Sequence, residues 1–371
     1  MKKLAVIHFL PLEDYPPILN LLAILDDDPE IITKAYSTQK FKKVESPTLK
    51  NVEIQRSKLP TLKSNRIVRS LYYINFIWKT LRGLIAYRPD LILYYDPFSI
   101  GPIYLYSKYF NPNSIVLGHY HELFTSEWYK KAMLMVRLFH NWEKSYIYRK
   151  VDWISQTNEE RVRLFLEQNP LVDKSKLHVV PNYPPLIWKD MVVKVSNNDN
   201  ILKLVYVGAI SLRNTYIKEV CEWVDKSESL MTLDIYSNNY DKETYSYLTN
   251  LKKDYIKFYY KGIAYDDLPK ILPKYSVGLI LYKADDLNFK FNAPNKLFEY
   301  YRCGLKVWCS EDMIGLKNII SEEELNLEYL NFNNLPHLKE LIFVQDRKNM
   351  ILNSKYSAET ALKELINAVK V

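Results

Sequence analysis

The alternation of short apolar runs with longer amphipathic segments is the feature that most constrains how this chain folds. Short apolar runs bounded by polar residues are typical of buried strands, and amphipathic segments between them are typical of helices. Strands separated by helices favour a parallel sheet that is covered on both faces. The strand-like runs span residues 4–10, 91–95, 114–119, 151–155, 176–180, 202–208, 231–236, 256–261, 277–282 and 306–309.

The length of the chain favours two domains. A chain of 371 residues is long for a single hydrophobic core, and no segment repeats at a fixed period. The strand-like runs divide into two groups, which predicts two doubly wound, Rossmann-like domains at residues 1–183 and 184–345. The remaining segment, 346–371, contains SAETALKELINAVKV, whose serine and apolar spacing predict a C-terminal helix.

Several common classes of protein are excluded by what the sequence lacks. It contains neither G-x-G-x-x-G nor G-x-x-x-x-G-K-[ST], the fingerprints of dinucleotide-binding and P-loop proteins. Cys221, Cys303 and Cys309 have no paired spacing, which argues against a disulfide framework or a zinc site and for a reducing compartment. No signal peptide is visible, because the N-terminal apolar run is interrupted at Glu13 before it reaches the usual length. No apolar run is long enough to span a bilayer. We therefore expect a soluble, cytoplasmic protein.

The segment 291–309, FNAPNKLFEYYRCGLKVWC, combines the parts of a nucleotide site. Pro294 suits the first turn of a helix, and the amides of Asn295, Lys296 and Leu297 would then be free at the helix end, where they attract phosphate. Lys296 adds a cation. Glu299, one turn later, is placed to accept hydrogen bonds from a ribose, and Gly304 is placed to end the helix before a strand at 306–309.

This segment resembles the donor-site motif of family 4 type GT-B glycosyltransferases (glycosyl transferases group 1), P-x-K-x-x-E-Y followed by G-x-P-V. Here the motif reads Pro294, Lys296, Glu299, Tyr300, Gly304, Leu305, Lys306 and Val307. The resemblance continues at 201–213, 233–239, 259–272 and 275–283. In the first half it is confined mainly to GHYHEL at 118–123 and HVVPNYP at 178–184, which look like an acceptor-side loop and an interdomain hinge.

The resemblance implies two Rossmann-like domains around an interdomain cleft, a C-terminal helix packed back on the N-terminal domain, and transfer of a sugar from a nucleoside diphosphate with retention. It implies that the base is read near Gly262 and Ile263, and that Arg213 and Lys296 stabilise the departing diphosphate. The expected donor-binding residues are Gly208, Arg213, Gly262, Ile263, Phe291, Asn292, Ala293, Pro294, Asn295, Lys296, Leu297 and Glu299.

The sequence departs from the family pattern at two positions. Phe291 stands where the family has the first of two glutamates, so its contact with the donor sugar is absent or supplied by another group. Ala209 stands where the family often has an arginine directly after the glycine, and Arg213 lies near the family's lysine position. The resemblance therefore leaves the identity of the donor sugar open.

Candidate acceptor-side residues follow strands of the first domain. His119 and His121 lie beyond a strand and would point to one face while the chain is extended. The resemblance makes His121 the better catalytic candidate, with Glu122 as its helper, and His8 and Asp96 occupy the analogous sheet edge. Two histidines lack further metal ligands with clear spacing, and the acidic run 26–28 before Pro29 is typical of a solvated turn. We expect no metal and no cofactor besides the donor.

Basic residues are concentrated in the first quarter of the chain. Residues 41–90 contain 11 Lys and Arg against 3 Asp and Glu. Residues 59–88 and 127–150 combine Lys and Arg with aromatic and aliphatic side chains, a pattern that suits an anionic membrane surface. Ordinary core helices with solvated lysines explain the same pattern, because doubly wound domains need such helices.

These observations favour a peripheral, cytoplasmic glycosyltransferase that acts on a saccharide or lipid-linked saccharide in bacterial surface polysaccharide biosynthesis. A nucleotide-sugar epimerase shares the two-domain frame and remains an alternative, as does a catalytically inactive relative. Nucleic-acid binding is disfavoured, although the sequence pI is about 8.9. The basic residues are mixed with apolar ones that a nucleic acid would not cover, and no DNA- or RNA-binding signature is present.

Overall fold

The computed structural model describes residues 1–39, 49–61, 64–192, 201–227, 230–317, 326–335 and 355–370. The chain divides into an N-terminal unit, Met1–Pro181 with Ala358–Val371, and a C-terminal unit, Asn182–Ser357. The division falls inside the segment 178–184 that the sequence analysis interpreted as a hinge. Residues 346–354 of the expected C-terminal segment, and Val371, lie outside the described residues.

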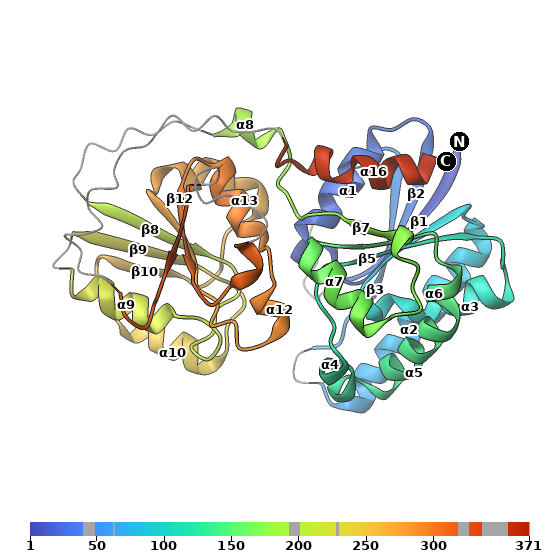
Figure 1. Ribbon diagram of the computed structural model, residues 1–371, viewed down its shortest axis with the longest axis horizontal. Coiled ribbons are helices and arrows are strands. Elements are labelled where there is room, and N and C mark those ends of the chain that lie inside the picture. Colours follow the sequence, from blue (N-terminus) through green and yellow to red (C-terminus); the bar gives the residue numbers. More distant parts are fainter. Residues whose placement is uncertain are drawn as a thin grey trace. The chain divides into compact units, whose positions relative to one another are not determined.

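The N-terminal unit is built on a parallel seven-stranded sheet in the order β3-β2-β1-β4-β5-β6-β7 (Figure 1). Helices cover both faces of this sheet. The strands are β1 Lys2–Pro11, β2 Ile31–Gln39, β3 Val52–Lys58, β4 Leu91–Tyr95, β5 Ile115–Tyr120, β6 Trp153–Gln156 and β7 Leu177–Val179. The helices are α1 Pro16–Asp26, α2 Arg66–Tyr87, α3 Ile100–Tyr109, α4 Ser126–Lys131, α5 Leu134–Trp142, the π-helical turn Glu143–Ile147, α6 Tyr148–Lys150, α7 Glu159–Gln168 and α16 Ala358–Lys370.

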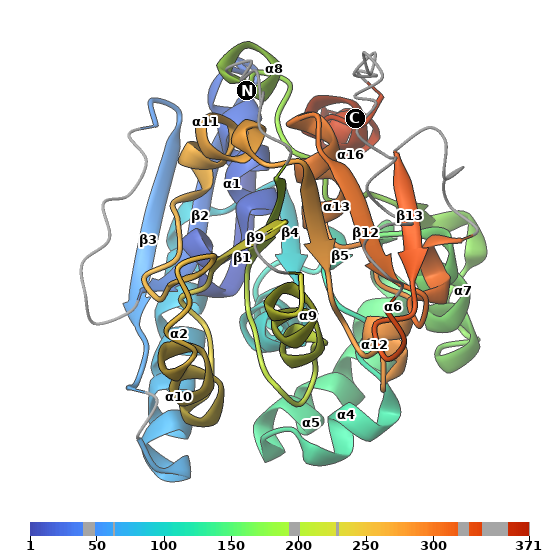
Figure 2. The same ribbon diagram turned by 90° about the vertical axis from the view of Figure 1, so that its left-hand side faces the viewer.

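The C-terminal unit repeats this design with a parallel six-stranded sheet in the order β10-β9-β8-β11-β12-β13. Figure 2 shows β12 and β13 running side by side. The strands are β8 Leu202–Val207, β9 Met231–Tyr236, β10 Ile256–Tyr259, β11 Val277–Ile280, β12 Lys306–Ser310 and β13 Leu327–Leu330. The longer helices are α9 Ile217–Asp225, α10 Lys242–Asn250 and α13 Asn295–Arg302, and the single-turn helices are α8 Trp188–Met191, α11 Leu268–Ile271 and α12 Leu287–Lys290.

Alternate residues of each strand enter separate hydrophobic cores on the two faces of the sheet. In the N-terminal unit, Ile7 and Ile92 pack with the side chains of α2, α3 and α5, whereas Val6 and Leu93 pack with α1 and α16. Helix α16 lies beside α1 (Figure 1) and places Lys370 Nζ 2.6 Å from Asp28 Oδ2. Lys370 of the C-terminal helix therefore forms an ion pair with the acidic turn at 26–28.

The sequence analysis located ten of the strands and missed β2, β3 and β13. Strand β2 carries Lys34, Thr33 and Ser37 among its apolar residues, and β3 is the polar edge strand VEIQRSK. An edge strand has a partner on one side only, so its sequence need not be apolar. The expected helical stretch 127–150 is divided into α4, α5, the π-helical turn and α6.

The turn that ends α13 was predicted correctly at Gly304. The N–H groups of Gly304 and Leu305 donate to the carbonyls of Tyr301 and Tyr300, at 2.9 and 3.0 Å. Gly304 has a φ of +78°, which glycine adopts without strain. Cys221, Cys303 and Cys309 are buried and unpaired, as expected from their spacing. Within the described ranges, no helix is long and apolar enough to cross a lipid bilayer.

Candidate functional site

Each of the two sheets has one point at which the order of its strands reverses, and some of the candidate residues lie at these two points. The strand order reverses between β1 and β4 in one unit and between β8 and β11 in the other. In open parallel sheets, ligands bind outside the carboxyl ends of strands at such switch points. His8 and Asp96 lie at the first switch point, and Gly208 lies at the second.

In the C-terminal unit, Lys296 lies directly over Gly208. A Cβ atom on Gly208 would come within 2.4 Å of Lys296 Cε and 2.7 Å of Lys296 Nζ, and Gly208 has a φ of +122°. Its N–H donates to the carbonyl of Tyr236 at 2.9 Å, which fixes the turn. Only glycine therefore provides both this backbone conformation and the space that the lysine side chain occupies.

Tyrosine side chains hold the Lys296 ammonium in place. Nζ donates a hydrogen bond of 3.0 Å to Tyr282 Oη and lies 4.9 Å from the ring centre of Tyr206. Burial works to lower the pKa of Lys296, but the phenol groups of Tyr206, Tyr282 and Tyr300 outweigh it and leave that pKa above its ordinary value. Lys296 is therefore a fixed cation at neutral pH.

Helix α13 begins one residue later than predicted, with Pro294 as its N-cap residue. The Leu297 N–H donates to the Pro294 carbonyl at 3.0 Å, so the expectation that this amide is free was wrong. The amides of Asn295 and Lys296 lie in the first turn, before intrahelical hydrogen bonds begin. Tyr300 Oη accepts a hydrogen bond of 3.0 Å from the Val207 N–H and thereby ties the helix to the end of β8.

Glu299 is a nearly buried carboxyl group one turn along α13, with 6% of its surface exposed. Burial raises the pKa of Glu299 to about 7, and the charge of Lys296 offsets only part of this rise. Close to neutral pH the group is therefore poised between its protonated and ionised forms. An ionised carboxylate here would accept hydrogen bonds from hydroxyl groups of a ligand.

The remaining predicted donor residues lie in loops that follow β8 and β10 and in the segment before α13. Arg213 is exposed in the loop between β8 and α9, and its N–H donates to Ser211 Oγ at 3.2 Å. Gly262, with a φ of +67°, packs against Asn238, and Ile263 is half-buried beside it. Phe291 and Asn292 are half-buried, whereas Ala293 and Pro294 are buried.

Sequence reasoning missed a basic pocket beside Phe291. A pocket of about 380 Å³ is lined by Lys283, Ala284, Lys290, Glu311, Asp312, Ile314 and Lys317. The loop 311–317, which forms part of the pocket wall, packs against the segment 291–309. A Cβ atom on Gly315 would come within 2.6 Å of Phe291 Cα. Lys283 directly follows the apolar run 277–282, which was the available signal for a cation at a strand end.

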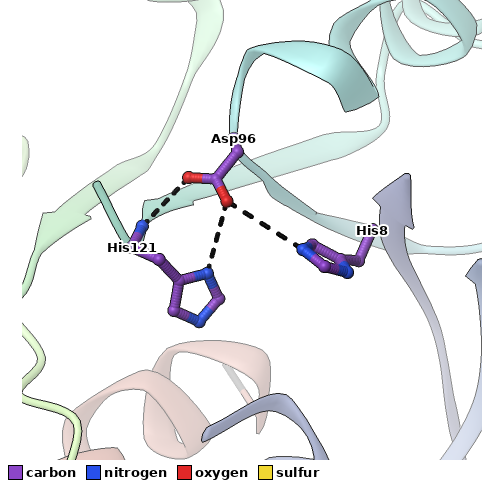
Figure 3. A group of neighbouring side chains, drawn as sticks. All are labelled: His8, Asp96 and His121. Atoms are coloured by element: carbon purple, nitrogen blue, oxygen red, sulfur yellow. Dashed lines mark hydrogen bonds and ion pairs between the residues drawn. The ribbon is translucent and has the colours of Figure 1, made fainter. Parts of the chain in front are cut away.

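In the N-terminal unit, the Asp96 carboxylate lies between the imidazole rings of His8 and His121 (Figure 3). Asp96 Oδ1 accepts a hydrogen bond of 3.0 Å from the His121 N–H. Asp96 Oδ2 lies 3.4 Å from His121 Nδ1 and 4.0 Å from His8 Nε2. His8 lies within β1, and Asp96 and His121 directly follow β4 and β5, so neighbouring strands position all three residues.

The backbone of Asp96 is strained, with φ 58° and ψ 163°. This region is essentially reserved for glycine, and another residue there costs about 1–3 kcal/mol. Burial raises the pKa of Asp96 to about 6, although His8, the His121 amide and Arg161 favour its ionised form. Burial also lowers the pKa of His8 and of His121 to about 3, so both rings are neutral. Strain and buried titratable groups together make this cluster a candidate functional site.

The partner of the His121 ring is Asp96, whereas the sequence analysis assigned this place to Glu122. Glu122 instead pairs with Arg161, whose Nη2 lies 3.3 Å from Glu122 Oε2. The buried Arg161 also donates to the His121 carbonyl at 2.6 Å. His119 lies beside His121, with ring centres 4.9 Å apart, and its Nδ1 lies 2.8 Å from Ser155 Oγ. Arg161 was missed because it reads as an ordinary polar residue of α7.

Comparison with known proteins identifies the architecture. No family model and no curated protein matches the sequence. Among solved structures, Anabaena Alr3699/HepE in complex with UDP and glucose is similar over 100% of both chains, with a TM-score of 0.68 and 11% identity. Sucrose-phosphate synthase from Thermosynechococcus elongatus gives a TM-score of 0.70 at 14% identity, covering 100% of this chain and 98% of that one. UDP-GlcNAc 2-epimerase from Neisseria meningitidis, bound to UDP-GlcNAc, gives a TM-score of 0.62 at 14% identity over 100% of both chains. The chain therefore has the GT-B fold.

Proposed function

We propose that this GT-B chain is a glycosyltransferase that moves a sugar from a nucleoside diphosphate to a saccharide or lipid-linked saccharide in bacterial surface polysaccharide assembly. The observation that carries this proposal is the placement of Lys296 over Gly208, at the end of β8 and the start of α13. A fixed ammonium beside the amides of a helix N-terminus is suited to a diphosphate. The UDP and UDP-sugar complexes of the similar structures support the same class of donor.

In the proposed reaction, the bond between the anomeric carbon and the β-phosphate oxygen breaks, and the diphosphate leaves with the electron pair. The acceptor oxygen bonds to the anomeric carbon and, with retention, passes its proton to the departing phosphate. Lys296, Arg213 and the first amides of α13 would stabilise the charge that grows on the phosphate, without a metal at this step. The family resemblance of 291–309 is the support for retention.

The donor sugar is proposed to lie near Phe291. In the resembling family a glutamate at this position contacts the sugar, and here the lysine-lined pocket of about 380 Å³ lies beside the phenylalanine that replaces it. His121 is proposed as an acceptor-side contact, with His8, Asp96, His119 and Glu122 as its surroundings. The base is proposed to lie near Gly262 and Ile263.

Glu299 gives the proposed donor site a characteristic pH dependence. Its pKa of about 7 predicts that nucleotide affinity rises with pH, because a carboxylate accepts hydrogen bonds from a ribose more strongly than a protonated carboxyl group does. Affinity at pH 6 should fall below its plateau by up to roughly tenfold, since about nine-tenths of the group is then protonated. Isothermal titration calorimetry with the preferred nucleoside diphosphate, from pH 5.5 to 8.5, measures this dependence.

The matched variant is Glu299→Gln, which keeps the shape but does not titrate. The phosphate titrates in both proteins, so the difference between the two pH profiles isolates Glu299. Identical profiles would contradict the assigned role. Glu299 also affects folding: its pKa is raised in the folded state, so its contribution to stability falls as pH rises from about 4.5 through 7.

A peripheral membrane location is proposed for the N-terminal unit. On α2, Ile67, Leu71 and Trp78 are 72%, 58% and 60% exposed. On α5, Leu134 and Trp142 are 63% and 39% exposed. Their helical spacing gives each helix an exposed apolar face, and the exposed Lys79, Arg82, Lys130 and Arg137 accompany them. Apolar side chains flanked by cations suit an anionic lipid surface.

Vesicle flotation tests the membrane proposal. The double variant Trp78→Ala/Trp142→Ala should bind vesicles containing anionic phospholipid roughly 30-fold more weakly, since each of the two partly inserted aromatic side chains contributes about 1 kcal/mol. Leu171→Ala is the control, because Leu171 is 79% exposed but lies outside these helices. Equal binding by all three proteins, or no binding by the wild type, would rule the surface out.

Product analysis tests the activity itself and separates the proposed transferase from an epimerase, whose structures have the same fold. The protein is incubated with its preferred nucleotide sugar, with and without saccharide and lipid-linked acceptors, and the products are identified by mass spectrometry and NMR. A transferase releases nucleoside diphosphate and lengthens the acceptor. Conversion to an epimeric nucleotide sugar without an acceptor would identify an epimerase and overturn the proposal.

A further inference from the structure

We propose that His8, Asp96 and His121 bind a divalent transition-metal ion of the zinc class, at a site separate from the donor nucleotide. These residues form a cluster of three metal-ligating side chains, all buried. One ligand atom from each residue lies within 4.8 Å of the other two. The sequence analysis expected no metal, because it compared spacings along the chain, whereas these ligands come from one strand, β1, and from the residues that follow two others, β4 and β5.

The hydrogen bond of His8 determines which of its nitrogens faces the cluster. His8 Nδ1 lies 2.8 Å from the Leu10 carbonyl, which only accepts, so Nδ1 carries the proton and donates. In the neutral ring, Nε2 then carries a lone pair. This Nε2 is buried, has no hydrogen-bond partner among the described residues, and lies 4.0 Å from Asp96 Oδ2. Two electron-rich atoms therefore face each other away from water, and a cation between them would satisfy both.

Hydrogen bonds from neighbouring groups already orient His8 and Asp96 as metal ligands would be oriented. Metal-binding histidines usually donate their second ring N–H to a carbonyl or carboxylate, as His8 does to Leu10. Asp96 Oδ1 is held by the His121 N–H, which leaves Oδ2 directed at the two rings (Figure 3). The strained backbone of Asp96 keeps the carboxylate in this position.

His121 completes the proposed set with little loss. Its Nδ1 lies 3.4 Å from Asp96 Oδ2, beyond the usual 2.7–3.2 Å of a good hydrogen bond, so replacing this contact by coordination costs little. Ligands on tetrahedral zinc are about 3.3–3.5 Å apart, because the bonds are about 2.0–2.2 Å long. The distances from Asp96 Oδ2 to the two ring nitrogens, 3.4 and 4.0 Å, are close to this separation.

The chemistry of the donor atoms selects the metal class. Two imidazole nitrogens and one carboxylate oxygen suit zinc and its neighbours, whereas magnesium and calcium prefer oxygen ligands. The charged side chains near the two rings include Asp96, Arg161 and Glu122. Arg161 and Glu122 form an ion pair whose charges cancel, which leaves the Asp96 carboxylate as a negative charge for a metal ion. Three protein ligands are one fewer than four-coordinate zinc takes, and a water molecule would complete the set.

Cobalt titration of chelator-treated protein tests the site. We expect one Co²⁺ per chain, with visible absorption bands of a low-coordinate nitrogen and oxygen site, displaced by equimolar Zn²⁺. His8→Gln and Asp96→Asn should each weaken binding at least tenfold, and circular dichroism checks that they fold. His178→Gln is the control, because His178 lies in the same unit but stacks on Trp153 at a ring distance of 3.4 Å.

The result that overturns the proposal is wild-type protein that binds no stoichiometric Co²⁺ or Zn²⁺, or binding that His178→Gln weakens as much as His8→Gln does. A zinc-edge anomalous difference map of zinc-soaked crystals gives an independent check, with a peak expected between the two rings and Asp96. Neither measurement uses a nucleotide or an acceptor. A failure here is therefore distinct from a failure of the proposed transferase function.

Discussion

Lys296→Met should weaken the binding of a nucleoside diphosphate by roughly 10- to 100-fold, since a hydrogen bond to a charged group is worth about 1.5–3 kcal/mol. Methionine preserves most of the length and volume of the side chain and removes only the ammonium. That ammonium is held over Gly208 by Tyr282 and Tyr206, so the variant removes a cation from a defined position. Isothermal titration calorimetry of both proteins measures the difference.

Lys226→Ala is the matched control for this experiment. Lys226 is an exposed lysine at the C-terminal cap of α9, and α9 runs away from the carboxyl ends of the strands. Its loss should leave nucleotide affinity unchanged. If Lys296→Met binds the nucleotide as tightly as the wild type does, the phosphate is not at this helix end and the proposed donor site is wrong.

Gly208→Ala should remove nucleotide binding to about the same extent as Lys296→Met. The new Cβ would meet Lys296 Cε at 2.4 Å and Nζ at 2.7 Å, so the lysine must leave its position. The φ of +122° also disfavours alanine, and we expect a loss of about 1–3 kcal/mol of folding stability. Urea unfolding measures the stability, and calorimetry measures the affinity.

Gly304→Ala separates the two effects of Gly208→Ala, which are displacement of Lys296 and strain of a backbone with positive φ. Gly304 also has a positive φ, of +78°, but a Cβ atom there would meet nothing within 4 Å. This variant should lose stability and keep its nucleotide affinity. Combining Gly208→Ala with Lys296→Met should cost little more affinity than either change alone, because both act through the same ammonium. Additive losses would show that Gly208 acts by another route.

The local structure of the segment 291–309 was predictable because its parts are contiguous in the sequence. The helix start, Lys296, Glu299 and the terminating Gly304 all lie within 291–309, and local rules govern them. What the sequence did not reveal is which distant residue each side chain meets. Gly208 lies far from Lys296 along the chain, and only the placement of β8 beside α13 makes its missing Cβ necessary for the lysine.

The sequence analysis named the proposed acceptor-side residues one by one, but it did not predict which of them contact one another. Sequence proximity favoured Glu122 as the partner of His121, whereas strand order brings Asp96 to it from the end of β4. The φ of 58° at Asp96 had no sequence signal, because such a conformation normally indicates glycine. The strands β2 and β3 were missed for a related reason: their burial depends on neighbours and not on their own hydrophobicity.

The measurement that most directly tests the proposed function is a melting-temperature screen of the folded wild-type protein with UDP, GDP, ADP, CMP and their sugar conjugates, alongside Lys296→Met. A ligand that binds only the native state must raise the melting temperature. We predict a rise with one nucleoside diphosphate and its sugar conjugate, and a much smaller rise in the variant. No rise with any nucleotide, or an equal rise in both proteins, would contradict the proposed donor site.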